Sequence, residues 1–200
     1  MNFLAHIYLS GDNELLKIGN FSADGIRGKS YKTYPLDMQA GILLHREIDT
    51  YTDAHPIVKQ STKRLHKYYS HYSGVIVDIY YDHFLAKNWS TYSTIALPVF
   101  VQDFYDSLNR HFDVLPERVK RLTPIMIEQN WLESYQHIEG IQKVLNGMNR
   151  RTKGLSKMNE ATKELEEHYD AFEKEFTIFF SELEMFSKVK KDELIKQFSL

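Results

Sequence analysis

The chain contains no cysteine among its 200 residues. This excludes disulfides, thiolate metal sites and a cysteine nucleophile, and it is consistent with a reducing compartment. With 5 prolines and 9 glycines, few residues interrupt regular structure. Lysine and arginine total 25 against 27 aspartates and glutamates, so the chain lacks the basic excess that is typical of general nucleic-acid binders.

Long apolar segments are also absent, since no run approaches the roughly 20 residues that a membrane-spanning helix needs. The N-terminal segment is apolar but has no basic leader and no small-residue cleavage site, so we expect no signal peptide. Phosphate-binding Gly-x-x-x-x-Gly-Lys loops, Gly-x-Gly-x-x-Gly turns and Gly-x-Ser-x-Gly elbows do not occur. We expect a cytoplasmic protein without a membrane or nucleic-acid partner, and not a nucleotide-driven motor, a dehydrogenase or a serine hydrolase.

Helical periodicity is present along most of the chain, and alternating strand patterns are scarce. The pattern predicts an all-α fold, a single-domain helical bundle over residues 1–200, whose 14% of aromatic residues pack the core between helices. Asp12 is expected to cap the second helix. The expected helices cover 3–9, 14–21, 35–52, 56–72, 75–87, 98–112, segments opening at Pro116 and Pro124, 159–180 and 187–198.

Histidine and aspartate residues lie on apolar helices of the N-terminal half. His45 and Asp49 are four residues apart, so a helix places both on one face. Such groups are costly to bury unless they are paired or bind a metal. Mixed His/Asp sites suit Mn, Fe, Mg or Zn, and a bound ion could activate water for phosphoester hydrolysis. An ordinary hydrogen-bonded pair is the alternative for any single His/Asp pair. The other members of the pattern are Asp78, Asp82, His83, His6 and Asp24.

Two basic stretches lack acidic residues. The first contains Lys59, Lys63, Arg64 and Lys67, and the second runs from 143 to 157 with Arg150 and Arg151. Each is either a solvated helix face or a docking surface for an acidic partner or a phosphate. Glycines and adjacent arginines make the second stretch the better candidate.

Several of these residues stand in recognisable motifs, and the motifs occur in order from Met1 to about Arg151. They are Met1-Asn2-Phe3-Leu4-Ala5-His6, Gly19-Asn20-Phe21-Ser22-Ala23-Asp24, Leu44-His45-Arg46-Glu47-Ile48-Asp49, Thr52-Asp53-Ala54-His55-Pro56, Asp82-His83-Phe84-Leu85-Ala86-Lys87-Asn88-Trp89 and Asn146-Gly147-Met148-Asn149-Arg150-Arg151. Together they resemble the acyl carrier protein phosphodiesterases.

The resemblance implies a helical fold distantly similar to the HD-domain metal phosphohydrolases. It implies hydrolysis of holo-acyl carrier protein to apo-protein and 4′-phosphopantetheine, with a divalent cation, Mn or Mg, as cofactor. The usual HD signature has adjacent His and Asp, whereas His45 and Asp49 lie one turn apart and the adjacent pair is reversed, Asp82-His83.

Our hypothesis for the site assigns a role to each candidate. The expected metal ligands are Asp24, His45, Asp49 and Asp82, with His6 as a further ligand. The expected general acid is His83 or His55, although His55 before Pro56 also suits helix capping. Arg46 is a candidate for neutralising phosphate charge, and the substrate-binding candidates are Arg150, Arg151, Lys63 and Arg64.

Two alternatives remain open at this point. One is an HD-type phosphohydrolase that acts on a nucleotide or another small phosphoester. The other is a non-enzymatic helical module that binds an acidic partner and keeps its buried polar residues only for structure. The sequence does not identify the oligomeric state.

Overall fold

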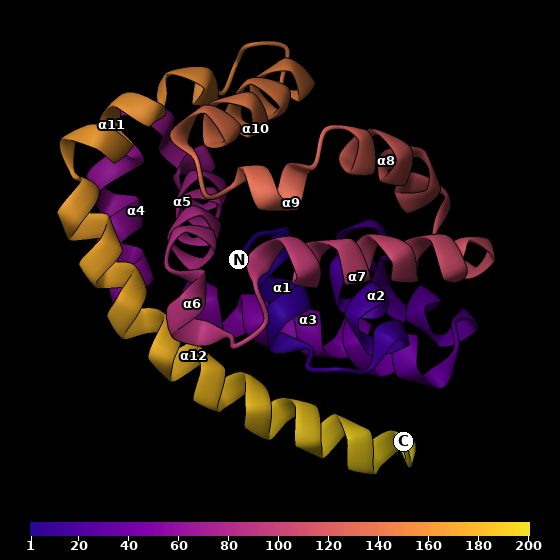
Figure 1. The fold of residues 1–200 in the computed structure, drawn as a ribbon. Helices are drawn as coiled ribbons and strands as arrows, with labels where there is room; N and C mark the ends of the chain where they lie inside the picture. Colours follow the sequence, from indigo (N-terminus) through magenta and orange to yellow (C-terminus); the bar gives the residue numbers. More distant parts are fainter.

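The computed structural model describes residues 1–200 and contains helices without any β-strand, which confirms the predicted all-α fold. Figure 1 shows how the helices are arranged. The α-helices are α1 (Phe3–Leu9), α2 (Glu14–Ser22), α3 (Leu36–Ala54), α4 (Pro56–Tyr69), α5 (Ser73–Lys87), α6 (Trp89–Tyr92), α7 (Leu97–Arg110), α8 (Glu117–Glu128), α9 (Trp131–Ser134), α10 (Ile138–Arg151), α11 (Thr162–Glu167) and α12 (Tyr169–Phe198). Short 3-10 turns include η1 (Ala23–Gly25), η2 (Gly28–Thr33) and η5 (Met158–Glu160).

Proline and glycine set the boundaries of the helices that carry the site. Gly11 follows α1 with a φ of +74°, a left-handed conformation that glycine adopts without strain. Pro35 precedes α3, and Pro56 is the first residue of α4, where its missing N–H costs nothing. Local sequence therefore defines α1, α3 and α4 well.

Two glycines bring α2 and α3 into close contact. A Cβ atom on Gly19 would overlap the carbonyl oxygen of Met38, and one on Gly41 would overlap that of Leu16. Only glycine permits this approach of the two backbones. This contact holds α3 in place. Helix α1, which precedes α2 in the sequence, also packs against α2.

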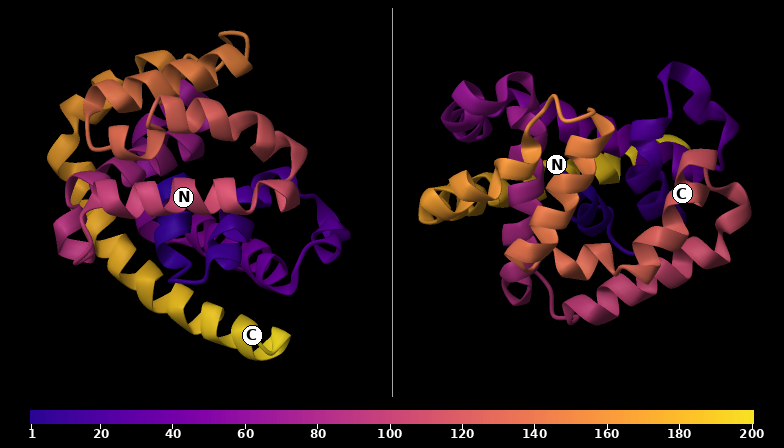
Figure 2. Two further views of the ribbon diagram at one scale, coloured as in Figure 1. Left: turned by 45° about the vertical axis from the view of Figure 1, so that its right-hand side comes forward. Right: turned by 90° about the horizontal axis from the view of Figure 1, so that it is seen from above.

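A cluster of 45 buried apolar residues extends from Met1 to Leu194 and forms the main core. Helix α12 curves around one side of the molecule and packs on α3, α4 and α5 (Figures 1 and 2). Helix α12 contributes four buried aromatic side chains to the core: Phe172, Phe176, Phe179 and Phe180. The aromatic residues therefore pack the core, as predicted.

Some predicted boundaries were wrong. Asn13, not Asp12, caps α2, since its side chain accepts a hydrogen bond from the Leu16 N–H. Pro124 lies inside α8 rather than at a helix start. The predicted helices 159–180 and 187–198 are instead η5, α11 and one continuous α12, because buried Phe and Leu side chains recur through the whole of α12.

Of the helices that were not predicted, α10 is the longest. Residues 138–151 form α10, although Gly140 and Gly147 weaken the local preference for a helix. Its burial of Ile141 and Leu145 stabilises it through tertiary packing. None of the helices combines the length and the hydrophobicity that a membrane crossing requires.

Candidate metal centre

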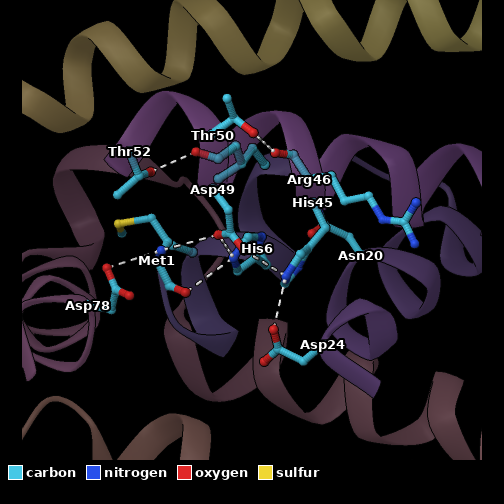
Figure 3. Close-up of polar contacts among 12 residues, drawn as sticks. Met1, His6, Asn20, Asp24, His45, Arg46, Asp49, Thr50, Thr52 and Asp78 are labelled. Atoms are coloured by element: carbon cyan, nitrogen blue, oxygen red, sulfur yellow. Dashed lines mark hydrogen bonds and ion pairs between the residues drawn. The ribbon is translucent and has the colours of Figure 1, made fainter. Parts of the chain in front are cut away.

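Four of the predicted site residues meet at one point, as Figure 3 shows. His45 Nε2 lies 3.0 Å from Asp49 Oδ2 and 3.3 Å from Asp24 Oδ1. His6 Nε2 lies 3.2 Å from Asp49 Oδ1, and the rings of His6 and His45 stack with centroids 3.9 Å apart. The Asp49 carboxylate therefore bridges two imidazoles.

These side chains come from three elements. His45 and Asp49 lie one turn apart on α3, as the spacing predicted. His6 lies in α1, and Asp24 lies in η1 directly after α2. The close packing of α2 on α3 thus determines how Asp24 reaches His45. The imidazoles are buried, whereas the side chains of Asp49 and Asp24 are 39% and 58% exposed, so the group opens toward solvent through its carboxylates.

The two histidines have opposite electrostatic environments. Burial alone would lower the pKa of His45, but hydrogen bonds and charges from Asp24 and Asp49 outweigh it and raise the pKa to about 9. Burial, together with the neighbouring His45, lowers the pKa of His6 to about 4. Burial would raise the pKa of Asp49, yet its hydrogen bonds to His45 and His6 hold it well below the ordinary value.

The donor set fits a divalent cation. His6, His45 and Asp49 each offer one ligand atom, and these atoms lie within 4.8 Å of one another. The Nδ1 atoms of both histidines are buried without a hydrogen-bond partner, whereas their Nε2 atoms face the carboxylates of the group. Two imidazoles and two carboxylates are a ligand combination that Mn, Fe, Mg or Zn sites use.

The α-amino group of Met1 lies beside the same carboxylate. It is 3.5 Å from Asp49 Oδ1 and 3.2 Å from Asp78 Oδ1. Burial would lower its pKa, but the charges of Asp78 and Asp49 raise the pKa to about 10. The Met1 carbonyl oxygen in turn lies 3.2 Å from His6 Nε2. Sequence patterns gave no signal for this contact.

Asp82 does not join the group, although it was expected among the metal ligands. Its carboxylate accepts hydrogen bonds from the backbone N–H groups of Leu4 (2.7 Å) and Ala5 (3.1 Å) in the first turn of α1. Burial raises the pKa of Asp82 to about 7, against the opposite effect of these two N–H groups. The structure therefore places Asp82 as a capping group for the helix that carries His6.

The two candidate general acids also lie apart from the group. His83 bonds through Nδ1 with the Tyr135 carbonyl and through Nε2 with the Tyr169 hydroxyl, both at 2.8 Å. His55 Nδ1 accepts the Ile57 N–H at the start of α4, and its Nε2 lies 3.1 Å from Glu182. His55 thus takes the capping role that its position before Pro56 suggested.

The candidate cations for phosphate and carrier binding have separate locations. Arg46 donates to the carbonyl oxygens of Ile26 (3.0 Å) and Gly28 (2.9 Å), so it holds the loop before η2. Arg64 is 2.6 Å from Glu175. Lys63 lies on an exposed face of α4 with Lys59 and Lys67.

Arg150 and Arg151 line a cavity of about 880 Å³ between α8, α9, α10 and the N-terminal segment. Residues on this cavity were missed from the sequence, among them Trp131 and Gln129. Arg118 was also missed; it lies against Gly25, the neighbour of Asp24. The signal that could have found Arg118 is its spacing from Leu122 and Ile125, which puts the three residues on one face of the helix predicted to open at Pro116.

The fold and this group define an all-helical protein with a candidate metal centre of the His/Asp type. The sequence model of the acyl carrier protein phosphodiesterases, a family of enzymes, matches residues 1–183, and the chain belongs to this family. This confirms the resemblance.

Relatives that carry the name acyl carrier protein phosphodiesterase match over most of the chain. One from Photorhabdus laumondii is 35% identical over 181 residues, which cover 90% of this chain and 91% of the relative. One from Yersinia pestis is 33% identical, with 90% and 94% covered. One from an Enterobacter species is 33% identical over 192 residues, with 96% and 100% covered. No solved structure matches the chain, so the likeness to the HD-domain fold stays a prediction.

Proposed function

We propose that this chain hydrolyses the phosphodiester that joins 4′-phosphopantetheine to a serine of holo-acyl carrier protein. The relatives are named for a phosphodiesterase acting on acyl carrier protein. The observation that carries the proposal is the convergence of His6, His45, Asp49 and Asp24 on one solvent-facing point. These four residues are the proposed ligands of a divalent cation, Mn²⁺ or Mg²⁺.

The reaction cleaves the bond between phosphorus and the serine oxygen. Water supplies the new P–O bond, its proton must leave, and the serine oxygen must gain a proton. Lewis-acid activation of water and neutralisation of phosphate charge are the chemistry that a divalent cation supplies in such a site. Asp24 is the most exposed carboxylate of the group, and its Oδ2 makes no hydrogen bond, so we assign it the role of orienting the attacking water.

The carrier protein is small and acidic, so cations around the site favour its docking. Arg150 and Arg151 are exposed, and neither forms an ion pair with a carboxylate. Arg64 is already occupied by Glu175, so the α10 side is the favoured docking surface. Docking there should weaken as salt rises, because exposed charges are screened beyond roughly 8–10 Å.

The experiment follows loss of the prosthetic group. Purified protein is incubated with holo-acyl carrier protein and Mn²⁺, and the carrier mass is measured over time. We expect conversion to the apo-form, and its loss when a chelator is added. His45→Gln and Asp49→Asn should abolish turnover. The matched controls are His111→Gln and Asp113→Asn, because His111 pairs with Glu14 and Asp113 is exposed, both outside the metal centre.

Two results separate the parts of the proposal. Wild-type turnover by Asp49→Asn would refute the metal centre as the active site. A carrier protein that keeps its prosthetic group with every divalent cation tested would refute the activity itself.

A further inference from the structure

The cavity beside α10 has a wall of mixed chemistry. Of its fifteen lining residues seven are hydrophobic, among them Phe3, Trp131 and Met148. Polar groups such as Asn2, Gln129 and Ser134 lie between them. Its volume of about 880 Å³ falls in the range of about 300–1,000 Å³ that small-molecule sites occupy. The wall suits an extended ligand with apolar parts and a few hydrogen-bonding groups.

The charged residues of this cavity are of one sign. Lys143, Arg150 and Arg151 line it, and no carboxylate does. All three cations are exposed, and no ion pair neutralises any of them. A ligand with negative charge at one end would therefore be attracted to this cavity.

Two stretches of chain link residues of the cavity to residues of the metal centre. Asn2 and Phe3 follow Met1, whose carbonyl oxygen lies 3.2 Å from His6 Nε2. In the other stretch, Arg118 of α8 lies against Gly25, next to Asp24, and Leu122 one turn later lines the cavity. A ligand that reaches the metal centre with a phosphate could thus extend into the cavity with its chain.

We propose that this cavity binds the 4′-phosphopantetheine arm of the substrate. The arm has a phosphate at one end and a flexible chain of apolar groups and neutral amides, which matches the charge and the wall of the cavity. This inference rests on the proposed function, because it takes the arm as the moiety that the enzyme releases. It adds the location of the arm and the residues that select for it.

Gly147 offers a way to fill the cavity without disturbing the fold. A Cβ atom at Gly147 would meet only the Arg150 guanidinium, at 3.9 Å, so a larger side chain has room. Gly147 lies inside α10, where replacing glycine favours the helix. Gly147→Leu should therefore fold and occupy space that the arm needs. Gly74→Leu is the matched control, since Gly74 also has open space around it and does not line the cavity.

The first measurement is binding of free 4′-phosphopantetheine in the presence of a chelator, which keeps it independent of turnover. Trp131 lines the cavity. The other tryptophan, Trp89, does not line it; it is buried, and its indole N–H donates a hydrogen bond to the Ile95 carbonyl. We expect the ligand to change Trp131 fluorescence, with no signal in Trp131→Phe. Gly147→Leu should raise the Kd at least about tenfold, and Gly74→Leu should leave it unchanged.

The second measurement tests the charge. Reversal of Arg150 and Arg151 to glutamate should raise the Kd about tenfold and flatten its salt dependence. The control reverses Lys188 and Lys196, two exposed cations of α12 that do not line the cavity. Decanoate is a competing probe, and stronger binding of decanoate than of 4′-phosphopantetheine would overturn the assignment in favour of an acyl-chain site.

The outcomes distinguish this inference from the proposed function. If Gly147→Leu binds 4′-phosphopantetheine and turns over holo-carrier protein like the wild type, the cavity assignment is refuted while the activity stands. If the ligand binds and Gly147→Leu prevents it, but no carrier protein is ever hydrolysed, the cavity assignment stands and the proposed function fails.

Discussion

Binding of Mn²⁺ to the metal centre should release one proton near neutral pH, and that proton should come from His45. Asp24 and Asp49 raise the pKa of His45 to about 9 from an ordinary 6.5. The difference corresponds to roughly 3 kcal/mol in favour of the imidazolium. A ligating imidazole must be neutral, so His45 would lose this proton when it binds a metal ion. His6 adds none, because its pKa of about 4 leaves it neutral already.

The magnitude follows from this proton count. With one proton released per ion, the Kd for Mn²⁺ should fall about tenfold for each pH unit, and about a hundredfold between roughly pH 6 and pH 8. Calorimetric titration in two buffers of different ionisation enthalpy counts the released protons directly. Asp24→Asn should lower the pKa of His45 and so reduce the proton count at the upper end of this range. His111→Gln should leave the count at one.

A Kd for Mn²⁺ that does not change with pH, with no proton released, would refute the reasoning. The same titration has a consequence for stability without metal. Since the folded pKa of His45 is raised, its stabilising contribution is complete below about pH 6.5 and is lost as the pH rises through about 9. The metal-free protein should therefore lose stability across this alkaline range, which chemical denaturation at several pH values would measure.

Three further predictions concern the scaffold. Glu175→Ala leaves Arg64 unpaired and should lower the free energy of unfolding by about 3 kcal/mol, which corresponds to a fall in Tm of roughly 6–12 °C. Turnover should be retained, and an unchanged Tm would contradict this prediction. Burial raises the pKa of Asp82 to about 7, so the free energy of unfolding should decrease as the pH rises from about 4 to about 7, by up to ~1.4 kcal/mol per pH unit. Asp82→Asn should remove this pH dependence, which denaturation at several pH values would measure. Gly41→Ala forces a methyl group against the Leu16 carbonyl, so it should lower the free energy of unfolding by about 1–3 kcal/mol and weaken Mn²⁺ binding. Wild-type stability and Mn²⁺ affinity in this variant would show that α2 and α3 can separate freely.

Local sequence patterns predicted most of the long helices and the His45–Asp49 half of the candidate metal centre. The four-residue spacing of His45 and Asp49 was enough, because an α-helix fixes their common face. Asp78 and Asp82 have the same spacing, which suggested that they supply the second half of the site. The spacing alone does not determine where this helix face points. Asp82 instead faces the first turn of α1, since the direction of a helix face depends on its neighbours and not on its own period.

The remaining features depend on contacts between distant segments. His6 reaches Asp49 because α1 packs on α2 and because Gly19 and Gly41 let α2 approach α3, and no local pattern encodes that sum of contacts. The cavity wall likewise joins Phe3 with Trp131, residues that only the folded chain brings together.

The short helix α1 connects both parts of the proposed active site. Asp82 holds its first turn through the Leu4 and Ala5 N–H groups, and Asp49 holds His6 one turn later. Phe3, in the same first turn, faces the cavity. Carboxylates of α5 and α3 thus hold the short helix that carries both His6 and the cavity residue Phe3. The geometry keeps the proposed phosphate-binding point and the proposed chain-binding wall in a constant relation, which favours the reaction of a substrate that occupies both.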